Sequence, residues 1–343
     1  MDMTMPGAPT ARTMPRTAAW NHAGGGQHAG LHNRVVLARI GPLTVVNFGL
    51  IAAVGGAVAA WIALARQEQA GMAPHDYAAL LFGGLPVLAV LGSRAFSVAL
   101  DWKTFVENPL AAALKPGFAF QGGLVGAAVA VAGVAAYANV DLFMLLDAMA
   151  LGFPLGHAVG RMACHTYGCC HGRPTKSPLA IRYTNPDSKA VWHSRLHGIP
   201  LHPTQLYSAL GNCLLFLVLA LLASYPLRAG EIAAAYLVLG SAGRFLIEFV
   251  RGEPTTRRMG LTPFQWVAMA SLACGLVLLR QALGNPLHER FADTAALLDA
   301  LRHSAFSVYP LWVFVCIFLS FGLQGRQVGS FGVRTSRRRP SRH

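Results

Sequence analysis

The sequence predicts an all-α protein, a polytopic transmembrane helix bundle of about 7–8 spans with a small polar head between two of them. Hydrophobic residues make up 54% of the 343 residues and charged residues only 12%, too few polar side chains to cover a soluble protein of this size. Apolar runs near the length that crosses a bilayer, about 20 residues, recur along the chain. They cover 44–65, 78–100, 118–137, 206–225, 232–250 and 261–279, with shorter or glycine-broken runs at 142–160 and 305–323.

Composition divides the chain into four parts. Residues 1–39 are rich in Pro, Gly, Ala, Thr and His and lack the long apolar centre of a signal peptide, so we expect a disordered basic tail. Residues 40–283 form the expected membrane domain, whose head covers about 161–205. An additional hydrophobic segment (284–325) and an Arg-rich disordered tail (326–343) follow. Glycines such as Gly152 and Gly156 suit close helix packing in lipid.

The net charge of +14 is concentrated outside the apolar runs. Basic segments that flank membrane spans usually meet anionic headgroups. Membrane lipids are therefore the expected partners, and nucleic acid is not.

Arg244 and Glu248 are four residues apart in an otherwise apolar run, so on a helix they lie on one face and pair. Ionised groups at membrane depth are candidates for function, and the planar guanidinium suits phosphate. The alternative is an ion pair that only fixes helix register. We expect Arg251, which directly follows the run, to extend to the headgroups as an anchor.

Arg161 ends a glycine-rich run and begins the polar head. It is either an interfacial anchor or a phosphate ligand. His202 and Gln121 are lone polar residues at span edges. Of the two, His202 is the better catalytic candidate because histidine titrates near neutral pH.

Cysteine and histidine are crowded at 164–171. Thiolate and imidazole are zinc ligands, but there is no CxxC pair, and the neighbouring Cys169 and Cys170 rarely both reach one ion. We expect no metal there; a disulfide from Cys164, or packing and pocket lining, are the other interpretations. The single cysteines in apolar runs, Cys213, Cys274 and Cys316, are expected to be small core residues.

Five groups of residues, in order along the chain, match the motifs of one known family. They are Gly-Pro at 41–42 with Asn-Phe-Gly-Leu at 47–50, Phe-Gln-Gly-Gly-Leu-Val-Gly at 120–126, the stretch 147–173, His-Pro-Thr-Gln-Leu-Tyr at 202–207, and 244–251 with Gly-Leu-Thr at 260–262 and Gln-Trp at 265–266. Over roughly 40–279 the chain resembles the prolipoprotein diacylglyceryl transferases.

The resemblance implies an activity: transfer of a diacylglyceryl group from phosphatidylglycerol to the lipobox cysteine of a prolipoprotein signal peptide. It implies a multi-pass protein of the bacterial inner (plasma) membrane that needs no cofactor. The charge count would put the head on the cytoplasmic face, but we favour the family's outer face. The implied catalytic residues are Arg161, Arg244, Glu248 and His202, and the implied substrate-binding residues are Arg161, Arg244, Gln121, Gly122, Gly123, Gly172 and Cys164.

Several residues depart from the family pattern. Gln121 stands where the family has histidine, and an amide cannot act as a base near neutral pH. Cys164 and Tyr167 replace two asparagines, and Cys169 replaces an acidic residue. The alternative function is therefore a catalytically inactive or repurposed phospholipid-binding membrane protein of the same fold. A relative that alkylates another thiol, or that depends on a metal, is a third.

Overall fold

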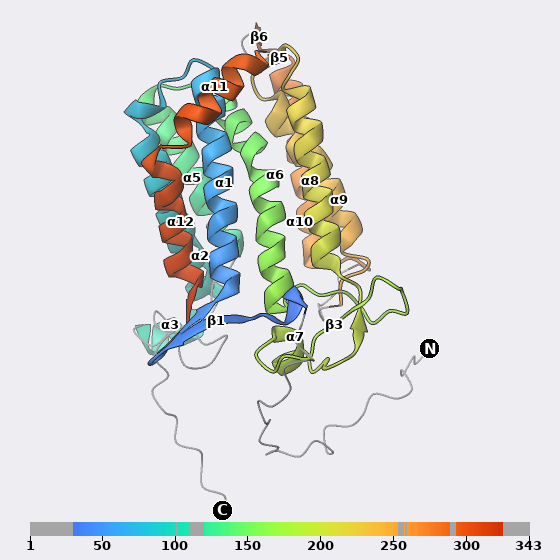
Figure 1. The fold of residues 1–343 in the computed structure, drawn as a ribbon. Helices are drawn as coiled ribbons and strands as arrows, with labels where there is room; N and C mark the ends of the chain where they lie inside the picture. Colours follow the sequence, from blue (N-terminus) through green and yellow to red (C-terminus); the bar gives the residue numbers. More distant parts are fainter. Residues whose placement is uncertain are drawn as a thin grey trace, which may run out of the picture.

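The computed structural model describes residues 30–100, 102–109, 120–252, 257, 259–288 and 293–324. The predicted tails at 1–29 and 326–343 lie outside these residues. The described part is a helix bundle with a small head at one end (Figure 1). Helix α6 (Leu142–Tyr167) runs through its centre beside α1 (Asn47–Gln69). To one side lie α2 (Gly84–Leu100), α5 (Phe120–Ala138) and α12 (Val308–Phe321), and to the other α8 (Thr204–Leu222), α9 (Glu231–Ile247) and α10 (Pro263–Ala282).

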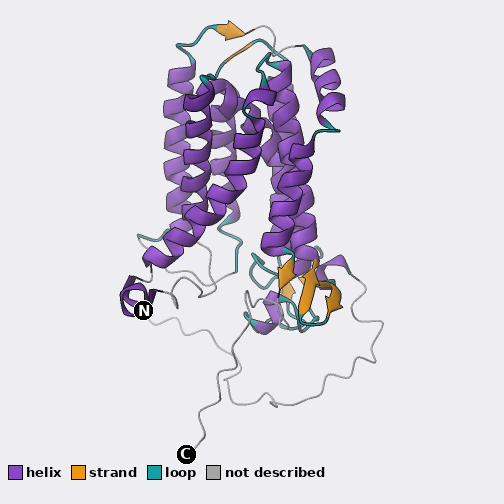
Figure 2. Ribbon diagram, turned by 90° about the vertical axis from the view of Figure 1, so that its left-hand side faces the viewer, coloured by secondary structure: helices purple, strands orange, loops and turns teal. Residues whose placement is uncertain are grey.

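Short elements connect and close the bundle. At the end away from the head lie η2 (Pro74–Asp76), the paired strands β5 (Leu227–Arg228) and β6 (Leu287–His288), and α11 (Thr294–Ser304), as Figures 1 and 2 show. The π-helical turn η3 (Ala79–Gly83) leads into α2, and α3 (Trp102–Glu107) follows it.

The prediction of a polytopic helical bundle is confirmed. Within the described residues, five helices are long and apolar enough to span a membrane, or six if the bent pair α11 and α12 is one span. They include 79–96, which joins η3 and α2, together with α1, α6, α8 and α10. The expected 7–8 spans also counted the runs of α9 and α5. Helix α9 has only 17 residues, and the apolar part of α5 is Val125–Ala138.

The outer face of α8 shows why this bundle belongs in lipid. Leu210, Leu214, Leu217 and Leu221 follow a helical repeat and are 54–63% exposed. A continuous stripe of exposed leucine would be unfavourable in water. It is the surface expected of a helix that faces acyl chains.

Helices α1 and α6 pack closely through small residues, as the glycines of the sequence predicted. A side chain on Gly55 would meet the carbonyl oxygen of Gly156 at 2.5 Å, so the two backbones touch. Buried residues on opposite sides of α6 belong to two apolar clusters, one shared with α1, α5 and α12 and the other with α8 and α9. Helix α6 therefore joins the two halves of the bundle.

Helix α6 is longer than the glycine-broken run predicted. It continues through Pro154 and ends at Tyr167, where Gly168 takes a left-handed conformation with φ 74°. The Gly168 amide donates to the Cys164 carbonyl at 2.9 Å, as in a glycine C-cap. This stop places Arg161 and Cys164 in the last two turns of the helix, next to the head.

The boundary expected for the N-terminal tail is wrong. Residues 30–39 form η1 (Leu31–Asn33) and most of β1 (Val36–Ile40), which pairs with β2 (Leu43–Val46). Val35 is 1% exposed, and the Asn33 side chain accepts hydrogen bonds from the head. Strand β2 also pairs with β7 (Leu323–Gln324), so the C-terminal segment returns to the same bundle.

The head folds around a small core of its own. Strands β3 (Ile181–Arg182) and β4 (Pro200–Leu201) pair, and α7 (Lys189–Trp192) contributes Ala190 to a buried core shared with Tyr183 and Leu201. Burial raises the pKa of the Tyr183 hydroxyl, which donates to the His165 carbonyl at 3.1 Å. The head is thereby tied to the end of α6.

At the other end of the bundle, Asp147 of α6 caps the N-terminus of α9. Its carboxylate is 1% exposed and accepts from the amides of Gly230 at 2.7 Å and Ala233 at 2.8 Å. The positive end of the helix dipole at the start of α9 attracts this carboxylate. The contact fixes α9 against α6.

Replacing Asp147 with Ala should destabilise the protein by about 2 to 4 kcal/mol, because two buried amides lose a charged acceptor. The measurement is the midpoint of thermal unfolding in detergent. The control is Asp141→Ala at the exposed N-cap of α6, where one bond to the Met144 amide is lost and about 1 kcal/mol is expected. An equal effect of the two changes would contradict the capping role.

Candidate active site

Three chain segments meet just below the ends of α6, α8 and α9. The Gly172 amide donates to the His202 carbonyl, and the His202 amide to the Arg173 carbonyl, both at 3.0 Å. The Arg173 amide donates to the Val250 carbonyl, also at 3.0 Å. These backbone hydrogen bonds hold the residues that follow α6 and α9 against those that precede α8.

Gly172, predicted to bind substrate, lies at this crossing. A Cβ atom there would be 2.5 Å from the Cβ of His202 and 2.6 Å from its carbonyl oxygen. No larger residue fits without moving the segments apart. Close packing therefore explains the glycine without a ligand.

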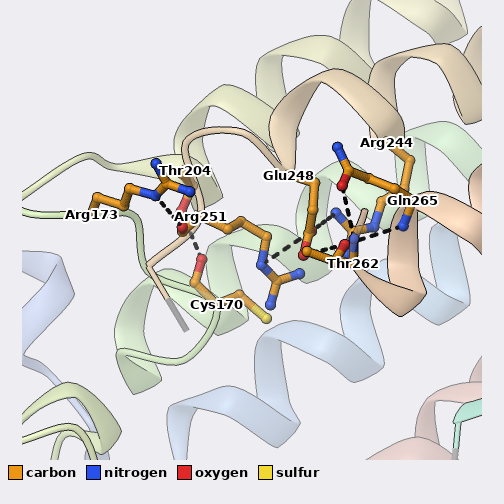
Figure 3. Close-up of polar contacts among 8 residues, drawn as sticks. All are labelled: Cys170, Arg173, Thr204, Arg244, Glu248, Arg251, Thr262 and Gln265. Atoms are coloured by element: carbon orange, nitrogen blue, oxygen red, sulfur yellow. Dashed lines mark hydrogen bonds and ion pairs between the residues drawn. The ribbon is translucent and has the colours of Figure 1, made fainter. Parts of the chain in front are cut away.

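Glu248 is the centre of the polar contacts (Figure 3). One carboxylate oxygen lies 2.6 Å from Arg244 and 3.7 Å from Arg251, and the other accepts from the Thr262 hydroxyl at 3.2 Å. The Glu248 side chain is only 3% exposed. The predicted pair of Arg244 and Glu248 is therefore present, and it is part of a larger network.

Arg251 is not the headgroup anchor that we expected. Its side chain is 10% exposed and turns back to Glu248. The guanidinium carbons of Arg244 and Arg251 lie 5.0 and 5.4 Å from the centre of the Phe264 ring, within the range of a cation–π contact. The i,i+3 spacing from Glu248 was the sequence signal for this pairing.

Helix α10 supplies the remaining partner. Thr262 is its N-cap, and Thr262 and Gln265 form a capping box, with Pro263 in the first turn. The pattern of a threonine followed three residues later by glutamine signals such a helix start in a sequence. Its consequence here is that the Thr262 hydroxyl is held facing Glu248.

Arg161 approaches the network from α6. Its charge and that of Arg251 act on Arg244, so the three cations lie near one another. The Nε atom of Arg161 is buried and has no hydrogen-bond partner among the described residues. His157, one turn earlier, lies near Arg161, Arg244 and Asn212 of α8. Sequence reasoning did not single out His157 or Asn212.

The three cysteines of the 164–171 stretch come together beside the arginines. The Sγ atoms of Cys164, Cys169 and Cys170 lie within 4.8 Å of one another, and the structure does not join them by disulfide bonds. The histidines of the stretch turn elsewhere. His171 bonds to the Gly172 carbonyl and to Ser194, and the His165 ring lies 5.6 Å from that of His32.

The side chains of the other predicted residues are not hydrogen-bonded to this group within the described part of the chain. The His202 ring lies 3.4 Å from the Tyr207 hydroxyl. Gly122 and Gly123 pack against α2. The side chain of Gln121 lies outside the described residues.

The fold and the site together define a polytopic membrane protein with a partly buried arginine cluster and a thiol cluster at one end of the bundle. The family profile described as prolipoprotein diacylglyceryl transferase matches residues 35–281. The match covers well over half of the chain, so the chain belongs to this family, as its motifs predicted.

Individual proteins with this family's name are similar to the chain over most of its length. The protein named phosphatidylglycerol–prolipoprotein diacylglyceryl transferase of Clostridium tetani is 27% identical over 242 residues, 70% of this chain and 94% of the relative. A second, of Clostridium perfringens, is 28% identical over 250 residues, with 71% and 94% covered. One of Geobacillus kaustophilus is 28% identical over 253 residues, with 73% and 93% covered.

Replacing Thr262 with Val keeps the shape of the side chain but removes the hydroxyl that caps α10 and contacts Glu248. We expect a loss of about 1 to 2 kcal/mol, measured as a lower midpoint of thermal unfolding. Thr262→Ser retains the hydroxyl and should stay close to the original protein. If Ser and Val are equally destabilising, the hydroxyl contacts contribute little.

Proposed function

We propose that this protein transfers the diacylglyceryl group of phosphatidylglycerol to the thiol of the lipobox cysteine in prolipoproteins, within the bacterial inner membrane. Membership of the family supports the reaction type. The observation that carries the proposal is the contact of Arg244 and Arg251 with the carboxylate of Glu248, together with the charge of Arg161 acting on Arg244. Three positive charges against one negative charge leave an excess suited to a phosphate.

In this reaction the acceptor thiolate attacks the glycerol carbon that carries the phosphate ester. A carbon–sulfur bond forms, the carbon–oxygen bond breaks, and its electron pair stays on the departing glycerol phosphate. Negative charge therefore grows on the phosphate in the transition state. Fixed cations in a site of low dielectric constant are the groups that stabilise such charge.

Each arginine has a distinct position for this role. Glu248 holds Arg244 and Arg251 on one carboxylate oxygen, which keeps both guanidinium groups in place without neutralising both. Arg161 carries a buried Nε that has no hydrogen-bond partner in the part of the chain that the structure describes, and buried donors of this kind are normally satisfied. A phosphate oxygen of the lipid would supply that acceptor.

Replacing Arg161 or Arg244 with Ala should lower the rate of lipidation about 100- to 1000-fold, because each removes a cation that stabilises the developing charge. Purified variants are given phosphatidylglycerol and a lipobox peptide, and the thioether product is followed by mass spectrometry. Arg280→Ala is the matched control, since Arg280 lies exposed near the end of α10. Full activity of either site variant would contradict the phosphate role of that arginine.

The unaltered chain should restore growth to a bacterial strain that lacks its own transferase. This test separates transfer from lipid binding alone, which the replacement of histidine by Gln121 had suggested as an alternative. A chain that inserts into the membrane, binds phosphatidylglycerol and does not restore growth would support the alternative. Immunodetection in isolated inner membranes confirms that the chain is present.

A further inference from the structure

The cysteine trio lies where α6 ends and the head begins. Its three Sγ atoms are within 4.8 Å of one another. In a tetrahedral zinc site with Zn–S bonds of about 2.3 Å, two sulfurs are about 3.8 Å apart. The largest separation in the trio is therefore within about 1 Å of the spacing that zinc requires.

The backbone explains how two neighbouring cysteines face one point. Side chains of adjacent residues in extended chain point to opposite sides. Cys170 instead has φ 56°, a left-handed conformation that is uncommon for a residue other than glycine. The carbonyls of Cys169 and Cys170 are held by Gln205 and Thr204, each at 2.7 Å. A strained residue fixed on both sides is typical of a functional site.

The surroundings suit an anionic metal–thiolate group. The charges of Arg161 and Arg251 act on Cys170, and in Figure 3 the Cys170 sulfur points toward the Arg251 guanidinium. A zinc ion with three thiolates has one net negative charge, and a fourth thiolate adds another. Positive charge beside the trio stabilises such a group.

The trio provides three protein ligands. His171 and His165, its neighbours in sequence, are not members of the group, and the His171 ring contacts Gly172 and Ser194. Zinc sites with three protein ligands and one exchangeable position are the catalytic kind, whereas structural sites have four. Thiolate ligands also favour zinc over harder cations.

We propose that Cys164, Cys169 and Cys170 bind one Zn²⁺ ion whose fourth position takes the thiol of the acceptor peptide. The binding of zinc stands on the geometry of the trio. The role of the fourth position rests on the proposed transferase function.

Such an ion supplies the step for which Gln121 is unsuited. A thiol that coordinates zinc loses its proton, which passes to solvent. The sulfur electron pair then forms the bond to the glycerol carbon, while the carbon–oxygen bond breaks toward the phosphate. Zinc changes no oxidation state, and the neutral thioether is a weaker ligand that leaves. The thiols and the arginine cluster lie side by side, so both reacting groups are held in one place.

Zinc binding is tested on the full chain in detergent with its thiols kept reduced. After incubation with Zn²⁺ and desalting, elemental analysis should find about one zinc ion per chain. The triple variant Cys164→Ser, Cys169→Ser, Cys170→Ser should retain none, and Cys274→Ser, outside the trio, should retain the full amount. Absence of zinc from the unaltered chain, or equal zinc in the triple variant, would overturn the site.

Folding of the variants is checked by size-exclusion chromatography and thermal unfolding. Should the triple variant aggregate, Cys164→Asn takes its place, since it introduces the residue usual in the family. It is expected to bind zinc far more weakly than the unaltered chain. Unchanged zinc affinity in a folded Cys164→Asn variant would refute coordination by this thiol.

The fourth position is tested with Co²⁺ in place of zinc. Adding a lipobox peptide should change the visible absorption of the cobalt, whereas the same peptide with serine for cysteine should not. An identical response to both peptides would exclude the acceptor thiol as a ligand.

Removing zinc with a chelator should lower the rate of lipidation about 100-fold or more, the usual effect of losing thiol activation, and adding zinc should restore it. Full transfer by zinc-free protein would refute the metal's role and leave the transferase function intact. A chain that binds zinc through the trio and transfers nothing would refute the proposed function and leave the metal site intact.

Discussion

The candidate site depends on one buried carboxylate. Glu248 is almost inaccessible, yet it contacts Arg244, Arg251 and Thr262. A buried anion is costly unless it is paired and hydrogen-bonded, and here both of its oxygens have partners. In return, two guanidinium groups remain at the end of an apolar bundle with fixed positions. Removing the carboxylate would leave these cations facing each other over Phe264.

Helix α6 brings the rest of the site to this carboxylate. One end is bound to α9 through Asp147, and the other carries Arg161 and Cys164. Because α6 also packs against α1 through glycine, its position is set along its whole length. The action of the Arg161 charge on Arg244 is therefore a property of the bundle as well as of the site itself.

The departures from the family pattern have a common physical meaning if the trio binds zinc. Relative to the family pattern that the resemblance implies, Gln121 in place of histidine removes a proton acceptor, and Cys164 and Cys169 add thiols beside Cys170. A metal that deprotonates the acceptor thiol makes a separate base unnecessary. The loss of the base and the gain of the thiols then compensate each other, whereas either change alone would indicate a site that has lost its activity.

The sequence by itself determined the membrane bundle, because apolar runs of spanning length follow from composition and order alone. It also predicted the pair of Arg244 and Glu248, since a spacing of four residues needs only a helix. Motifs identified the family. The tertiary structure decided what depends on separate elements meeting: the burial of Arg251, the contact of Thr262 with Glu248, and the folding of residues 30–39 onto strand β2. It also decided the gathering of the cysteines, because the left-handed turn at Cys170 and the carbonyl contacts from Thr204 and Gln205 exist only once α6, the head and α8 have packed.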